Sequence, residues 1–280
     1  ALDAADDDTL SPPHERALAA AFGWHGADGT LPFAARAAAT DGIAVGTLAW
    51  GLVTPCHWLV GRDHVTLVDP AALELTEHES RAAFDAVRPL FEGDGFRFEW
   101  GAPMRWYAAH ESLADLPCAA LDRVIGRDVE RWLRAGDDAG GRPATPLRRV
   151  RRLQAEWQLL LYPHPLNEAR EQRGALTLNS FWLSGCGRFQ PEHGTAPLVD
   201  ERLREPLLAQ DFVAWADAWR ALDAEALGAL LDASRDARVT LTLCGERAAQ
   251  RFESAPSRGW WQRAGDRWRA PEPRAVLEAL

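Results

Sequence analysis

The stretch LYPHPLNEAREQRGALTLNSFWLSGCGR, residues 161–188, is the part of the chain that decides the predicted fold. His164 lies between two prolines, which hold its backbone extended after the preceding helix. Pro165 suits the first turn of a short helix, and Gly174 suits its end. Residues 176–183 (LTLNSFWL) then predict a strand that leads into a glycine-rich turn at 184–188.

Helices and strands alternate outward from this stretch. The predicted strands lie at 43–53, 57–61, 64–69, 96–100, 104–108 and 239–245. The predicted helices run from a capping box at Thr76 to about Phe91, through 121–134, from Leu147 to about Tyr162, within 200–232, and after Pro273. We therefore expect an α/β or α+β fold with a mixed sheet and flanking helices.

The chain is predicted to have three parts. Residues 1–40 form an irregular N-terminal segment with one short helix, residues 41–245 form the main domain, and residues 246–280 form a C-terminal tail rich in Trp and Arg. The segment GDDAGGRPATP at 136–146 is rich in Gly and Pro and predicts a break between two lobes of the main domain.

The composition narrows the function classes. The 280 residues carry 31 basic residues, all arginine, and 41 acidic residues, for a formal net charge of −10. This balance argues against nucleic acid or a membrane as a partner. The absence of lysine excludes Schiff-base, PLP and P-loop chemistry. No apolar run is long enough to cross a bilayer, and the acidic start ALDAADDD is unlike a targeting signal. With scattered cysteines and no CxxC pair, we expect a cytoplasmic protein.

The polar residues of 161–188 predict a site for an anion. Asn167, Arg170 and Arg173 recur every third residue and share one helix face. Arginine pairs with phosphate or carboxylate, and a glycine-rich turn lets the backbone approach such a ligand. The predicted ligand-binding residues are His164, Asn167, Arg170, Arg173, Asn179, Trp182, Gly185, Gly187 and Arg188.

The geometry expected of this site follows from the short loop between the helix and the strand. His164, Asn167 and Arg170 should cluster near the turn at 184–188, with Asn179 and Trp182 on the strand between them. The ligand would be a phosphorylated or carboxylated small molecule. The alternative is structural: arginines on a helix often form a solvated face, and Gly-x-Gly is a common turn.

The same stretch resembles the archaeal-type cofactor-independent phosphoglycerate mutases. In that family the pattern HPxNxxR is followed by a Gly and by an Asn-containing strand that ends in Trp-x-x-G-x-G. The matching residues are His164, Pro165, Asn167, Arg170, Gly174, Asn179, Trp182, Gly185 and Gly187. The chain departs from the family at Ser184 and Cys186, where an aromatic residue and a Gln are usual. The resemblance implies an α/β domain of the alkaline-phosphatase type.

Residues 45–245 are more similar to the RpfE-type family of bacterial regulatory proteins. The segments 54–70, 153–174 and 178–188 carry this resemblance. The mutases need a Ser or Thr nucleophile and two metal ions held by Asp and His. Here His193 is the only histidine after residue 188. Asp41-Gly42 resembles the Asp-Gly opening of the family but is not followed by its nucleophile pattern. The resemblance therefore implies a degenerate mutase-like domain with a regulatory or ligand-binding role, without phosphoryl transfer and with no cofactor.

Two other functions stay open, and no catalytic residue is assigned. An active phosphoglycerate mutase would need a divalent metal. A structural interaction module would bind an unidentified protein through the tail, where Trp260, Trp261 and Trp268 alternate with arginines.

Two further clusters have a structural and a functional interpretation. The sequence LRRVRRL at 147–153 predicts either salt bridges to the acidic surface or contact with an acidic partner or anionic ligand. Cys56, His57, Asp63 and His64 predict ordinary hairpin residues rather than a metal site. A thiol nucleophile at Cys56 or Cys186 would lack an identifiable third group.

Overall fold

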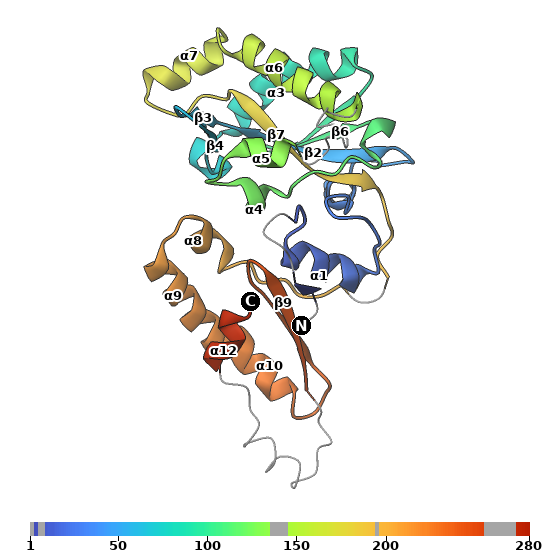
Figure 1. The fold of residues 1–280 in the computed structure, drawn as a ribbon, viewed down its shortest axis with the longest axis vertical. Coiled ribbons are helices and arrows are strands. Elements are labelled where there is room, and N and C mark those ends of the chain that lie inside the picture. The colour runs from blue at the N-terminus through green and yellow to red at the C-terminus, as the bar shows by residue number, and fades with distance from the viewer. Residues whose placement is uncertain (1–2, 5–8, 135–144, 194–195, 255–272) are drawn as a thin grey trace. The chain divides into compact units, whose positions relative to one another are not determined.

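The computed structural model describes the chain except for residues 1–2, 5–8, 135–144, 194–195 and 255–272 (Figure 1). The chain forms two compact units. The larger unit comprises residues 9–11 and 22–194, and the smaller unit comprises residues 1–8, 12–21 and 195–280. These boundaries differ from those of the predicted segments, because the N-terminal strand and most of the first helix belong with the C-terminal residues.

The larger unit is built on a four-stranded sheet. Its order is β5 (Arg97–Ala102), β6 (Arg105–Ala109), β2 (Ala49–Cys56) and β7 (Ser180–Arg188), and neighbouring strands run antiparallel. A separate hairpin joins β3 (Trp58–Val60) to β4 (Val65–Leu67), and an isolated parallel bridge links Leu67 to Ile125. The sheet with flanking helices confirms the predicted fold class.

One face of this sheet holds the main core. Helices α3 (Glu77–Gly93) and α6 (Thr145–Leu161) bury their apolar residues against it, and α7 (Pro165–Gln172) follows α6 on the same side (Figure 1). The predicted capping box at Thr76 is confirmed. The aromatic side chains of this core are closely packed. The Phe91 ring stacks on Phe98 with 4.0 Å between the ring centres, and it contacts Trp157 edge-on.

The opposite face is covered by smaller elements. The alanine-rich α2 (Phe33–Thr40) packs on Trp50 and Tyr107. Next to it, α4 (Leu121–Val124), α5 (Val129–Leu133) and the β3–β4 hairpin enclose Trp182. Two 3₁₀ turns follow in the chain: η1 (Pro70–Leu73) joins β4 to α3, and η2 (Glu111–Leu113) joins β6 to α4.

The smaller unit contains a three-stranded antiparallel sheet in the order β1 (Asp3–Ala4), β9 (Ala248–Glu253) and β8 (Thr240–Cys244). Its helices are α1 (Pro13–Phe22), whose last residue belongs to the larger unit, α8 (Arg204–Leu208), α9 (Phe212–Leu222), α10 (Gly228–Ala233) and α12 (Pro273–Glu278). The π-turn η3 (Asp223–Leu227) joins α9 to α10.

Several predicted elements have other bounds. The first 40 residues hold two helices rather than one, and strand β9 was not predicted. The strand predicted from residue 43 begins at Ala49, because a turn with Gly46 at φ +57° precedes it. The predicted break at 136–146 and the tail tryptophans lie largely or wholly outside the described residues. Within the described ranges, no helix is both long and apolar enough to span a bilayer.

The predicted glycine-rich turn at 184–188 is strand instead. Strand β7 runs to Arg188, and Gly187 and Arg188 pair with Trp50 and Ala49 of β2. A register shift between Trp50 and Leu52 absorbs an extra residue, as in a β-bulge. The glycines allow this bend, since Gly185 has a φ of +61°.

Candidate functional site

Arg170, the central residue of the predicted anion site, is fully buried in the larger unit. Its guanidinium donates hydrogen bonds to the Glu79 carboxylate at 2.8 Å, to the Leu176 carbonyl at 2.6 Å and to the Leu73 carbonyl. All three nitrogens of the guanidinium therefore have partners inside the protein. Arg170 ties α7 to the start of α3 and to the chain that leads into β7.

Glu79 is the carboxylate that Arg170 and Arg173 share. Burial of Glu79 opposes its ionisation, but hydrogen bonds from Thr76, Arg173 and Arg170 outweigh this effect and lower its pKa from 4.5 to about 2. Arg173 contacts it at 2.5 Å from a half-exposed position. Both predicted arginines thus share one structural carboxylate.

Asn167 and His164 also bond to the main chain. The Asn167 amide donates to the carbonyls of Leu161 and Leu178, each at 2.9 Å, and its oxygen accepts from the Leu178 N–H at 2.8 Å. His164 caps α7 by accepting a hydrogen bond from the Leu166 N–H at Nδ1. These bonds close the α6–α7 corner against the strand that follows.

Asn179 and Trp182 join the strand to other segments. The Asn179 amide forms two hydrogen bonds with the main chain of Trp58, at 2.7 and 2.9 Å, so it mimics a strand partner for β3. The Trp182 indole is buried, and its N–H donates to the Ala119 carbonyl at 2.9 Å.

The last predicted residues lie at the other end of β7. A Cβ atom on Gly185 would stand 2.9 Å from the Ala34 nitrogen, and one on Gly187 would stand 3.1 Å from Pro32, so both glycines pack against the start of α2. Arg188 donates to the Thr47 carbonyl at 2.6 Å and to the Glu111 carboxylate at 3.0 Å.

These positions do not bring the predicted residues together. The side chains of α7 bond to Leu176 and Leu178, just before β7 begins, whereas Gly185 and Gly187 lie near the end of β7. A strand rises about 3.3 Å per residue, so the ends of a nine-residue strand are about 26 Å apart. Arg170 and the segment 184–188 have different partners throughout. Within the described residues, the stretch 161–188 forms a framework of internal hydrogen bonds rather than one pocket.

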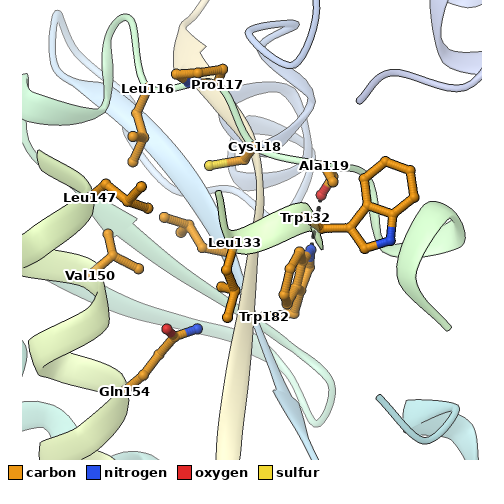
Figure 2. A pocket seen from close by; sticks show the side chains of 11 residues that line it. Leu116, Pro117, Cys118, Ala119, Trp132, Leu133, Leu147, Val150, Gln154 and Trp182 are labelled. Atoms are coloured by element: carbon orange, nitrogen blue, oxygen red, sulfur yellow. Dashed lines mark hydrogen bonds between the residues drawn. The ribbon is translucent and has the colours of Figure 1, made fainter. Parts of the chain in front are cut away.

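A small cavity lies beside this framework. Its walls include Leu116, Cys118, Leu147, Gln154 and Trp182 (Figure 2). Its volume of about 30 Å³ has room for little more than a water molecule. Trp182 is the single residue of the predicted set in these walls, and it lies there with its N–H bonded to Ala119.

The other predicted clusters are also used within the fold. Among the described residues, no group of three or more His, Cys, Asp or Glu side chains is arranged to hold a metal. His57 Nδ1 lies 2.9 Å from the Thr177 carbonyl, and burial raises the pKa of the Cys56 thiol. Asp41 accepts two hydrogen bonds from Arg105, and these lower its pKa.

A different group of polar side chains contains a guanidinium that is only partly used. His110 follows β6 at the start of η2, and its Nδ1 lies 3.0 Å from the Ser112 nitrogen and 2.8 Å from the Ser112 hydroxyl. Arg149 Nη1 lies 3.1 Å from His110 Nε2. Since arginine has no acceptor, Arg149 donates this bond and Nε2 accepts it. We call His110, Ser112 and Arg149 the anion site.

The carboxylates near the anion site are bonded to other arginines. Asp94 pairs with Arg152, and Glu111 pairs with Arg188. The Arg149 guanidinium stands 5.9 Å from the ring centre of Phe96, and the described residues supply it with no carboxylate.

The ionisation of His110 reflects these neighbours. Burial and the positive charge of Arg149 lower its pKa, while Glu111 and Asp94 act in the opposite direction more weakly. The site thus combines a permanent cation with a neutral imidazole. The basic sequence 147–153 pointed to Arg149. His110 and Ser112 were missed, although the spacing His-x-Ser at a strand end is a capping signal.

Comparison with known proteins gives a distant structural neighbour. The chain is similar to the cofactor-independent phosphoglycerate mutase from Thermoplasma acidophilum DSM 1728, with 15% sequence identity and a TM-score of 0.37. The alignment covers 64% of this chain and 48% of the mutase, so the chain spans about half the length of that protein. No protein-family model and no curated protein matches the chain. The function proposed below therefore rests on the geometry of this chain.

Proposed function

We propose that this protein is a binding protein whose larger unit holds a phosphorylated or carboxylated small molecule at the anion site. The observation that carries the proposal is the Arg149 guanidinium, which meets no carboxylate among the described residues and uses Nη1 for its hydrogen bond to His110 at 3.1 Å. An oxyanion would accept from its other N–H groups. It would also give Arg149 the negative charge that the described residues do not supply.

The neutral imidazole suits this role. The neutral ring accepts from Arg149 and adds no second full charge. Charge-assisted bonds to phosphate or carboxylate are about twice as strong as neutral ones. Arg149 therefore supplies the attraction, and its bond to His110 positions the guanidinium.

The finer parts of the proposal come from the sequence. The resemblance to the RpfE family supports a regulatory role in the cytoplasm, without phosphoryl transfer or a cofactor. A coupled phosphoglycerate mutase assay with added Mn²⁺ tests this part. We expect no turnover above background, and turnover that follows protein concentration would overturn the non-catalytic assignment.

The binding experiment uses inorganic phosphate and 3-phosphoglycerate as probes in isothermal titration calorimetry. Wild-type protein should bind one or both, and Arg149→Gln should weaken binding at least about tenfold, which corresponds to about 1.4 kcal/mol. Arg148→Gln is the matched control, because Arg148 is exposed on the same helix turn and bonds to Thr145. The proposal fails if wild type binds neither probe or if both variants lose affinity equally.

A further inference from the structure

Two of the four free cysteines lie side by side in the larger unit. The sulfur atoms of Cys118 and Cys186 are 3.6 Å apart. Cys186 is a fully buried residue of β7, and Cys118 is partly buried in the segment between η2 and α4. Cys56 is buried elsewhere, and Cys244 is exposed in the smaller unit. The two neighbouring thiols are 68 residues apart in the sequence.

The main chain holds both cysteines in place. The Cys118 N–H donates to the Gly29 carbonyl at 3.0 Å, and the next residue, Ala119, accepts from the Trp182 indole at 2.9 Å. Cys186 lies at the bulge of β7 and is held by the pairs on either side, Ser184 with Leu52 and Gly187 with Trp50. Since a disulfide bond is about 2.05 Å long, the sulfur atoms need to approach by about 1.5 Å, a distance that side-chain rotation can supply.

Only one of the two thiols is open to small molecules. Cys118 lines the small cavity beside α6, and its side chain extends into the space that Leu147 and Val150 also border (Figure 2). A hydrogen peroxide molecule is close to water in size and fits such a space, whereas the Cys186 side chain has no exposed surface. The hydrogen bond with Cys118, together with burial, raises the pKa of the Cys186 thiol. Oxidation is therefore expected to begin at Cys118.

We propose that Cys118 and Cys186 are a redox-modification site that hydrogen peroxide converts to an intramolecular disulfide. Peroxide transfers one oxygen atom to the Cys118 sulfur, which gives a sulfenic acid and one water. The Cys186 sulfur then attacks the Cys118 sulfur; the S–O bond breaks, and the hydroxyl leaves as a second water with the Cys186 proton. Peroxide is reduced and the two thiols are oxidised by two electrons in all. This site is separate from the anion site and does not depend on the proposed function.

The test uses the full chain with Cys244→Ser, which removes the exposed thiol. Treatment with hydrogen peroxide should lower the titratable thiols of the denatured protein from three to one. Trypsin cuts after arginine, so Cys118 and Cys186 fall in separate peptides, Trp106–Arg123 and Gly174–Arg188. Mass spectrometry should find these peptides joined with the loss of two hydrogen atoms, and dithiothreitol should separate them.

Two further variants in the same background act as controls. Cys118→Ser should keep both remaining thiols at the peroxide dose that oxidises the parent, and Cys186→Ala should give sulfenic or higher acids at Cys118 without a cross-link. If either variant fails to fold, the cross-linked peptide of the parent still decides the question. The proposal is wrong if the parent shows no such peptide, if each cysteine is oxidised separately, or if the cross-link involves Cys56.

Discussion

The stretch 161–188 and the anion site differ in what their polar groups contact. In the stretch, the side chains of His164, Asn167, Arg170 and Asn179 bond to main-chain groups or to Glu79. In the anion site, Arg149 meets a neutral ring nitrogen and, among the described residues, no carboxylate. The residues with the most recognisable sequence pattern hold the fold together, whereas Arg149, which has no distinctive pattern around it, keeps N–H groups for a ligand.

The largest expected effect comes from removing Arg170. Arg170→Ala deletes three internal hydrogen bonds and leaves part of the Glu79 charge buried, which should lower the free energy of unfolding by about 3–5 kcal/mol in urea denaturation. Arg173→Ala is the control, because Arg173 bonds to the same carboxylate from a half-exposed position and should cost about 1 kcal/mol or less. If Arg170→Ala keeps its stability and loses only phosphate affinity, Arg170 belongs to a ligand site and the comparison is reversed.

A second prediction concerns the far end of β7. Gly185→Ala places a methyl group 2.9 Å from the Ala34 nitrogen in a residue with a φ of +61°, and should cost about 2–3 kcal/mol through clash and strain. Gly174→Ala has a similar φ of +73° in open space and should cost about 1 kcal/mol. Thermal and urea unfolding of the two variants measure the difference. Equal losses would show that the approach of α2 to β7 contributes nothing.

The third prediction is the acid response of the framework. The pKa of Glu79 is about 2 in the folded protein against an ordinary value of 4.5. The unfolded chain therefore binds this proton first, and the stabilisation is present above pH 4.5 and is lost as the pH falls toward 2. Between these limits, wild type should lose about 2 kcal/mol more than Glu79→Gln in urea titrations. Parallel pH profiles would contradict the assigned ion pair.

The sequence predicted the fold better than it predicted the site. Both hairpins of the larger unit and the helix that begins at Thr76 follow from local signals such as alternation and capping, which act over a few residues. The end of β7 could not be predicted from local signals, because the bulge at Gly185 depends on the long-range pairing of β7 with β2. Nor does local spacing show that Glu79, 91 residues away in the sequence, neutralises Arg170.

The smallest expected effect tests the anion site through His110. Arg149 is one of two causes of the lowered pKa of His110, and burial is the other. Arg149→Gln should therefore raise this pKa toward 6.5 without reaching it, because burial remains. Arg148→Gln, with its side chain turned to Thr145, should leave it unchanged. An NMR titration of the imidazole measures both.

The same variants test how the titration of His110 changes the stability of the protein with pH. Because the folded-state pKa of His110 lies below its unfolded value, the unfolded chain takes up the proton first, and stability is lost as the pH falls below about 6.5. Arg149→Gln should reduce that loss, and added phosphate should raise the His110 pKa in wild type but not in this variant. A His110 pKa that responds to neither the substitution nor phosphate would mean that no anion binds at Arg149. The polar groups of the anion site would then be structural, like those of the stretch 161–188.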